Sequence, residues 1–134
     1  MDNLYKIAYS YSKKRILIKN SHNGKAKLFC LIGKLKKNNI YSCGINKYNI
    51  DNNFGSIHAE VDACNKLKYS KKNIKVDILI LRTNNKGDKL LNSKPCLNCL
   101  NYIKRNLNLK NYKFSRIYFT DNDKINFIKS TIII

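Results

Sequence analysis

The sequence is short of several residue types, and each shortage narrows what it can encode. It holds no tryptophan, one proline, one methionine and five glycines in 134 residues. No apolar run reaches the roughly 18 residues of a membrane-spanning helix, and no apolar segment near the N-terminus leads to a small-residue cleavage site. Five unevenly spaced cysteines are too few for a disulfide-stapled secreted scaffold. We therefore expect a soluble intracellular protein, cytoplasmic or nuclear, with reduced thiols and no membrane partner.

Acidic residues are scarce. Only 8 of them stand against 27 lysines and arginines, which gives a formal net charge of +19. Lys, Asn, Ile and Tyr make up 71 of the 134 residues, and such a coding bias supplies lysine without any function. The same bias should supply glutamate as freely, yet Glu60 is the only glutamate. The charge is therefore compatible with a solvated surface and with a polyanion partner.

The apolar pattern predicts one α/β domain over residues 1–134. Helical spacing predicts helices at 3–15, 56–69 and 96–107. Apolar runs on either side of polar turns predict hairpins at 25–45 and 115–130, and a β-branched run predicts a buried strand at 73–81. This order indicates a mixed sheet with helices packed on it. Only 14 residues follow Thr120, too few for a helix and a returning parallel strand, so we expect the last strand to be antiparallel.

Two short motifs begin the second and third predicted helices. His58 and Glu60 belong to "HAE", and Cys96 and Cys99 belong to "PCLNC", which begins with the single proline, Pro95. Each motif follows a strand, and in α/β arrangements strand ends and helix starts meet at one edge of the sheet. An imidazole and two thiols can therefore converge there.

These residue types suit zinc. Cys96 and Cys99 are one helical turn apart, and a helix N-terminus lowers thiol pKa values toward the thiolate that metals bind. Three protein ligands leave a fourth position open, as in catalytic zinc sites. Glu60 lies about 200° from His58 on an ideal helix, which places it poorly as a ligand but allows it to move protons beside the metal. Ser56 is the expected N-cap of this helix, with Glu60 as a capping-box residue.

Other interpretations of these residues are weaker. A zinc ribbon needs a second CxxC pair, and a zinc finger needs two histidines a few residues apart, whereas His22 and His58 are 36 apart. A redox CxxC leaves "HAE" unexplained. Taken singly, His58 is compatible with an ordinary hydrogen-bonded histidine and Glu60 with a helix cap. The combination favours zinc.

H-x-E followed by P-C-x-x-C is the signature of zinc deaminases. With its hairpin, HAE helix, strand, PCxxC helix and strand, the chain resembles the cytidine deaminase-like superfamily. The resemblance implies a three-layer α/β/α fold with a five-stranded mixed sheet. It implies Zn²⁺ held by His58, Cys96 and Cys99, with Glu60 as the general acid and base. The "GIN" at 44–46 matches the family's G-x-N, which implies a substrate contact from Asn46, and we expect another from Ala59. Weaker candidates are Ser93, Phe54, which can stack on a base or pack locally, and Arg82, which can meet phosphate or belong to a solvated loop.

The activity implied is hydrolytic deamination of cytosine in a pyrimidine nucleoside, a nucleotide or a single-stranded nucleic acid. H-A-E departs from the C-A-E typical of free-nucleoside cytidine deaminases, and an antiparallel last strand is unlike the tRNA adenosine branch. An adenosine deaminase acting on RNA and a catalytically silent zinc-binding nucleic-acid module remain alternatives. Many superfamily members are dimers or tetramers, so we expect a homo-oligomer.

Overall fold

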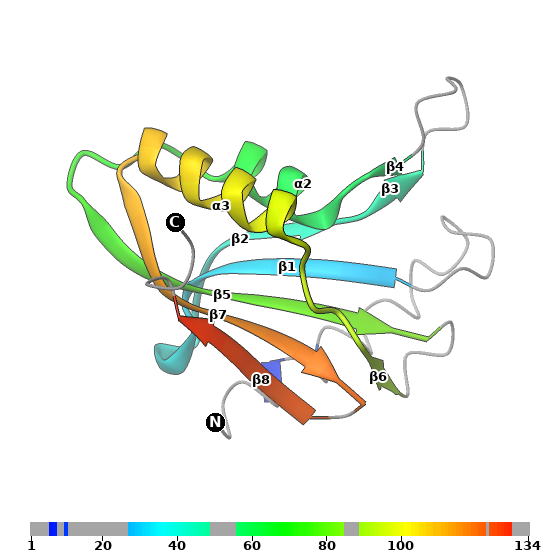
Figure 1. Cartoon of the computed structure of the whole chain (residues 1–134). Helices are drawn as coiled ribbons and strands as arrows, with labels where there is room; N and C mark the ends of the chain where they lie inside the picture. The colour runs from blue at the N-terminus through cyan, green and yellow to red at the C-terminus, as the bar shows by residue number, and fades with distance from the viewer. Residues whose placement is uncertain are drawn as a thin grey trace.

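The computed structural model describes residues 6, 7, 10, 27–48, 56–84, 89–122 and 124–129. Its main sheet has five long strands in the spatial order β2-β1-β5-β7-β8 (Figure 1). They are β1 (Lys27–Lys34), β2 (Asn39–Ile45), β5 (Ile74–Thr83), β7 (Tyr112–Asp121) and β8 (Lys124–Lys129). β5 and β7 are parallel and the other neighbours are antiparallel, so the predicted five-stranded mixed sheet is confirmed.

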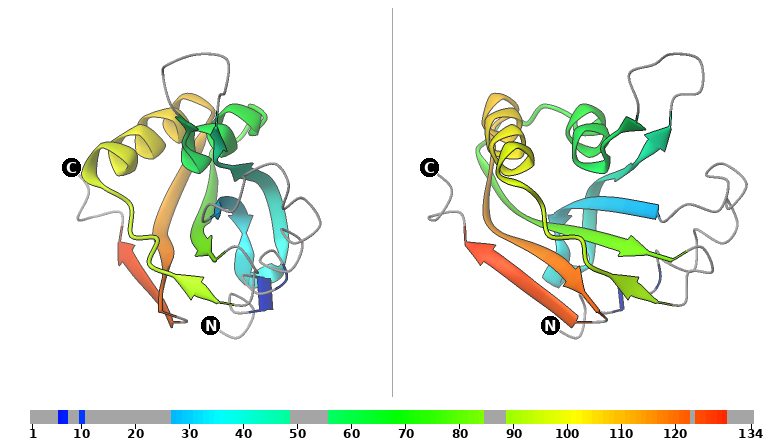
Figure 2. Two further views of the ribbon diagram at one scale, coloured as in Figure 1. Left: turned by 90° about the vertical axis from the view of Figure 1, so that its right-hand side faces the viewer. Right: turned by 45° about the vertical axis from the view of Figure 1, so that its right-hand side comes forward.

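Both long helices lie on the same face of this sheet (Figures 1 and 2). They are α2 (Ala59–Lys66) and α3 (Leu97–Leu109). Of the first predicted helix, residues 6, 7 and 10 are described and are helical, and Ile7 packs into the core on the opposite face. The described residues also form short elements: η2 (Leu35–Lys37), β3 (Lys47–Tyr48), β4 (Ser56–Ile57) and β6 (Leu90–Leu91). β3 pairs with β4, and β6 pairs with the end of β5.

β5 is the buried centre of the fold. Val76, Ile78 and Ile80 belong to the core under the helices. Leu79 and Leu81 belong to the core on the other face. Because successive side chains of a strand point to opposite faces, a strand covered on both sides needs a continuous apolar run. The β-branched run of the sequence indicates this placement, and the structure confirms it.

The last two strands form the predicted hairpin. β7 and β8 pair antiparallel in an unbroken register from Arg116 opposite Lys129 to Asp121 opposite Lys124. Asn122 in the turn has a φ of 49°, a left-handed conformation that asparagine tolerates better than most residues. The short tail therefore adds an antiparallel strand at the edge of the sheet, as expected.

α2 lies directly against β2. A Cβ at Gly44 would overlap the carbonyl oxygen of Ala59 and the backbone nitrogen of Ala63, so only glycine permits this approach. The Ser42 hydroxyl donates to the Ala63 carbonyl at 2.7 Å. The backbone N–H of Ile45 donates to the Asp62 carboxylate at 3.0 Å. These contacts fix the start of α2 relative to the end of β2.

The opposite end of α2 is capped from a distant part of the chain. The ammonium of Lys110, just after α3, donates to the carbonyls of Cys64, Asn65 and Leu67. The next residue, Asn111, has a φ of 68°, and its side chain donates to the Ser70 carbonyl at 2.8 Å. A cation at a helix C-terminus satisfies free carbonyls and interacts favourably with the helix dipole. The loop after α2 and the turn after α3 are thus joined.

Replacing Lys110 by methionine is expected to lower the free energy of unfolding by about 1 to 2 kcal/mol, because the last carbonyls of α2 lose a charged donor while the aliphatic volume is kept. Urea denaturation measures the change. Lys113→Met is the matched control, since Lys113 is exposed on β7. Equal losses in the two variants would contradict a capping role for Lys110.

Candidate metal centre

His58 lies at the N-cap of α2. Its backbone is extended, with φ of −70° and ψ of 149°, and its imidazole is exposed. The predicted N-cap was Ser56, which is wrong because Ser56 belongs to β4. The capping box is also absent, since Glu60 is then the second helical residue and no side chain caps the helix. Glu60 is buried, and its carboxylate lies 3.9 Å from Nδ1 of His58.

The two predicted thiol ligands begin α3. Cys96 is the N-cap, and its sulfur accepts from the backbone N–H of Cys99 at 3.4 Å. The two sulfurs are 3.3 Å apart, and the Cys99 sulfur lies 3.9 Å from Nδ1 of His58. Pro95 immediately precedes the N-cap, where it does not interrupt the helix. The structure therefore brings the two motifs together at the helix starts, as the sequence predicts.

The thiol pKa values differ from the prediction in one respect. The N–H of Cys99, together with the hydrogen bond between the sulfurs, lowers the pKa of Cys96. Burial, then the hydrogen bond to Cys96 and the charge of the Glu60 carboxylate, together raise the pKa of Cys99 to about 12. A helix start was expected to lower both pKa values. Only the exposed N-cap thiol follows that rule, because the half-buried Cys99 lies beside two groups that can carry negative charge.

The donor atoms of these four residues, called here the donor cluster (His58, Glu60, Cys96 and Cys99), suit a metal ion. Ligand atoms of His58, Glu60 and Cys99 lie within 4.8 Å of one another. Tetrahedral zinc with its usual bond lengths holds two sulfurs about 3.8 Å apart, and a sulfur and an imidazole nitrogen about 3.6 Å apart. The observed 3.3 Å and 3.9 Å are each within about 0.5 Å of these separations. Thiolate and imidazole donors also favour zinc over magnesium or calcium.

The position of Glu60 corrects the helical-wheel estimate. An angle of about 200° from His58 was expected to place the carboxylate poorly as a ligand. That angle applies only within a helix, whereas the extended backbone of His58 turns its imidazole toward the first turn of α2. The Glu60 carboxylate therefore lies close enough to the His58 imidazole and the Cys99 sulfur to share a metal ion with them.

Asn46 and Ala59 are the first two predicted substrate contacts. Asn46 is buried just after β2, its backbone N–H donates to the Leu28 carbonyl, and its side-chain oxygen accepts from the Leu28 N–H at 2.9 Å. The amide therefore continues the pairing of β2 with β1. Ala59 is fully buried as the first residue of α2. Their contact with a substrate stays a prediction.

Ser93 fastens the loop that leads to Cys96. Its hydroxyl donates to the Ile80 carbonyl at 2.7 Å and accepts from the Thr120 N–H at 2.8 Å. The Thr120 hydroxyl in turn donates to the Leu91 carbonyl at 2.6 Å. Ser93 and Thr120 are both buried, so this network fixes the loop to the ends of β5 and β7. A substrate contact of Ser93 stays a prediction beside this structural role.

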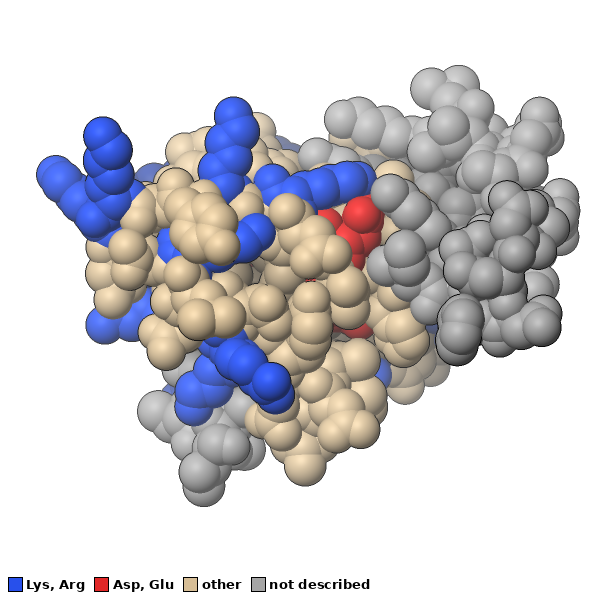
Figure 3. All heavy atoms as spheres, turned by 90° about the horizontal axis from the view of Figure 1, so that it is seen from above, with Lys and Arg blue, Asp and Glu red and all other residues tan. Residues whose placement is uncertain are grey.

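The structure says less about the two remaining predicted substrate contacts, Arg82 and Phe54. Arg82 is exposed and follows the alternation of Ile78 and Ile80, which puts it on the helix-covered face of the sheet. Phe54 lies outside the described residues. Viewed from the helix side, acidic side chains show only in a narrow strip beside the grey region, and lysine and arginine side chains are scattered over the part of this face that is described (Figure 3).

Sequence reasoning missed three positioning residues: Asp62, Lys110 and Thr120. Each acts on backbone far away in sequence, by 17, 46 and 29 residues in the bonds described above. Asp62 gave a usable signal, because a second acid in the first turn of one helix is unusual in a chain with 8 acids. Lys110 and Thr120 gave none, since nothing in the local pattern marks a distant partner.

None of the protein-family models, curated proteins or solved structures compared with this chain matches it. Among the described residues, no helix has both the length and the apolar character needed to cross a membrane. The fold and the donor cluster define the class of this protein: an α/β domain with a mixed sheet and a His/Glu/Cys cluster that can hold a metal ion at the start of two helices.

Proposed function

We propose that this domain is a zinc-dependent hydrolase that removes the amino group of cytosine in a nucleoside, a nucleotide or a nucleic acid and releases ammonia. The observation that carries the proposal is the meeting of an imidazole and a buried carboxylate from α2 with two thiols from α3. A structural metal site needs no carboxylate beside it, whereas hydrolysis needs a group that moves protons.

His58, Cys96 and Cys99 would hold the ion. When bound, zinc supplies a Lewis acid and lowers the pKa of water into the neutral range. The other chemistry belongs to Glu60. Its carboxylate takes one proton from the attacking water and delivers it to the ring nitrogen of the base. It then takes the second proton from the hydroxyl formed at C4 and passes it to the departing amine, which leaves as ammonia. The C4–N bond breaks, a C4–O bond forms, and the products are uracil and ammonia.

The surroundings of the donor cluster support this role for Glu60. The helix start is held by Gly44, Ser42 and Asp62 against β2, so the carboxylate has a fixed position. His58 and Cys96 are exposed while Glu60 is buried, which leaves the site open to a ligand from the solvent side. Catalysis benefits from such a rigid carboxylate beside an accessible centre.

The test is ammonia release by the zinc-loaded protein from cytidine, deoxycytidine, CMP, dCMP, and single-stranded DNA and RNA. We expect release from at least one cytosine compound. An adenosine-containing RNA is included, and release from it alone would replace cytosine by adenine in the proposal. Bound zinc without ammonia from any compound would contradict the enzyme and leave a silent zinc-binding module.

A further inference from the structure

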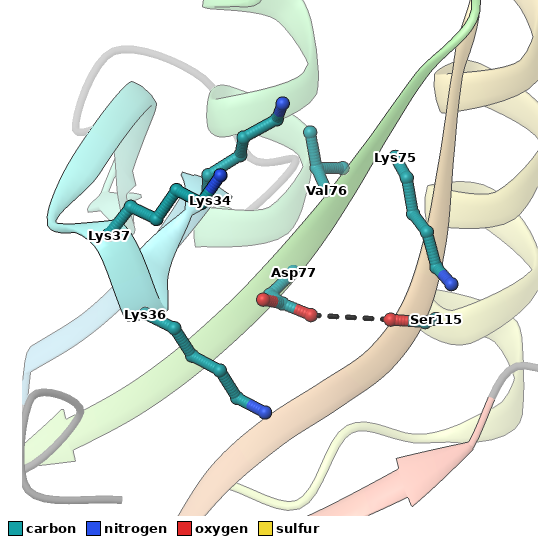
Figure 4. Close-up of a pocket in the computed structure, with 7 residues that line it drawn as sticks. All are labelled: Lys34, Lys36, Lys37, Lys75, Val76, Asp77 and Ser115. Carbon is teal, nitrogen blue, oxygen red and sulfur yellow. Dashed lines mark hydrogen bonds between the residues drawn. The ribbon is translucent and has the colours of Figure 1, made fainter.

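A second feature lies at the opposite end of the sheet from the donor cluster. A hollow of about 380 Å³ is lined by four lysines, one carboxylate, one hydroxyl and one valine; we call it the lysine hollow, formed by Lys34, Lys36, Lys37, Lys75, Val76, Asp77 and Ser115 (Figure 4). The donor cluster lies further along β5, because Ser93, in the loop that leads to Cys96, donates to the carbonyl of Ile80. Asp77 and Ile80 are three positions apart on the strand, about 10 Å, and none of the seven lining residues belongs to the donor cluster. The two sites are therefore distinct.

Irregular strand pairing shapes the lysine hollow. In the β5–β7 pair, Val76 faces Phe114 and Ile78 faces Ile117, so two residues of β7 stand opposite Asp77. Such a bulge re-aims side chains, and here the Ser115 hydroxyl donates to the Asp77 carboxylate at 3.3 Å. At the neighbouring turn, η2 brings two successive lysines beside the end of β1. Lysines from β1 and η2 thus stand on one side of Asp77, with Lys75 on the other (Figure 4).

The charge of the lysine hollow favours an anion. Four exposed lysines stand around a single carboxylate, and that carboxylate already accepts from Ser115. Each lysine presents a hydrated ammonium group, a common partner of phosphate that lacks the forked geometry by which arginine reads base edges. No aromatic ring is among the lining residues, so stacking on a base is not provided. These side chains therefore suit contact with phosphate groups but not recognition of a base sequence.

We propose that the lysine hollow binds the phosphate backbone of a single-stranded nucleic acid. The hollow is more than ten times the volume of about 30 Å³ that one water occupies, and its ammonium groups come from both sides. A strand with successive phosphates offers a negative charge to several of these ammonium groups, whereas one phosphate ion offers a single charged group. The choice of a nucleic acid rests on the proposed function, because a polymeric substrate would place its phosphates beyond the donor cluster.

The test measures binding of a fluorescent oligothymidylate of about 15 nucleotides, which has no amino group to remove, so the result does not depend on deaminase activity. The test variant is Lys34→Gln, Lys37→Gln and Lys75→Gln together. The control variant, Lys104→Gln, Lys124→Gln and Lys129→Gln, removes the same charge from exposed positions on α3 and β8. Thermal unfolding of both variants checks that they fold.

The test variant is expected to bind about tenfold or more weakly at low salt and to show a salt slope shallower by about 2, since each lost phosphate contact on a single strand reduces it by about 0.7. The control variant should keep an affinity and a salt slope close to those of the original protein. Equal weakening in both variants would mean that net charge alone attracts the strand and would overturn the proposal. Displacement of the oligonucleotide by inorganic phosphate at constant ionic strength would also overturn it, in favour of a free-phosphate site.

Discussion

Changing Glu60 to glutamine is expected to leave zinc bound and to lower turnover by about 10²- to 10⁴-fold, the usual contribution of a positioned general acid and base. Glutamine keeps the shape of the side chain but cannot carry the proton between water, ring nitrogen and amine. The measurements are ammonia release and zinc content of the same purified sample. Asp121→Asn makes the same carboxylate-to-amide change at the end of β7 and should retain activity.

Zinc content separates the two roles that the geometry allows Glu60. Its carboxylate lies 3.9 Å from the His58 imidazole, close enough to share an ion. If Glu60→Gln loses zinc while Cys96→Ala keeps it, the carboxylate is a ligand and the proposed mechanism fails. Full activity with zinc retained would equally refute the assignment of Glu60 as proton carrier.

Changing Cys99 to alanine is expected to weaken zinc binding by more than about 100-fold. Loss of a residue that only hydrogen-bonds a metal ligand weakens binding by up to about 100-fold, and loss of a ligand itself should cost more. Cys99 is the central donor, since its sulfur lies near both the Cys96 sulfur and the His58 imidazole. Elemental analysis after dialysis measures the loss. A second measurement is the rise in thermal midpoint on adding zinc, which mass action requires of a bound ion.

Cys43→Ala is the matched control for Cys99→Ala. Cys43 is a half-buried thiol on β2 without a place in the donor cluster. It should keep the zinc content and the zinc-dependent rise in midpoint. If Cys99→Ala binds zinc as the original protein does, the metal centre lies elsewhere. A midpoint that zinc does not raise in the original protein would mean that the folded protein does not bind zinc.

The sequence was sufficient for the arrangement of the main elements. A nearly continuous β-branched run indicated β5, and two apolar runs on either side of a polar turn indicated the hairpin of β7 and β8. The meeting of His58 with Cys99 also followed from the pattern, because both motifs stand between a strand and a helix. These features depend on residue spacing and hydrophobicity, which can be recognised in short stretches of the sequence.

Other features depend on contacts that spacing does not encode. The start of α2 was placed at Ser56 because serine is a good cap, yet β4 takes that residue and His58 begins the helix. The pKa of Cys99 could not be inferred from its helix position, since burial outweighs the helix start. The lysine hollow depends on a bulge opposite Asp77, which no local pattern marks.

The lysine that caps α2 has a wider consequence. Lys110 follows α3 but bonds the end of α2, so the two helices are clamped together at the end away from the donor cluster. Near the donor cluster, each helix is fastened instead to its own strand, by Asp62 and by the Ser93 network. The donor cluster thus lies at the starts of two helices that are held separately at their starts and joined at their ends. Because each start is held by its own strand, loss of the contacts at residues 110 and 111 is expected to lower stability without changing the separation of His58 and Cys99.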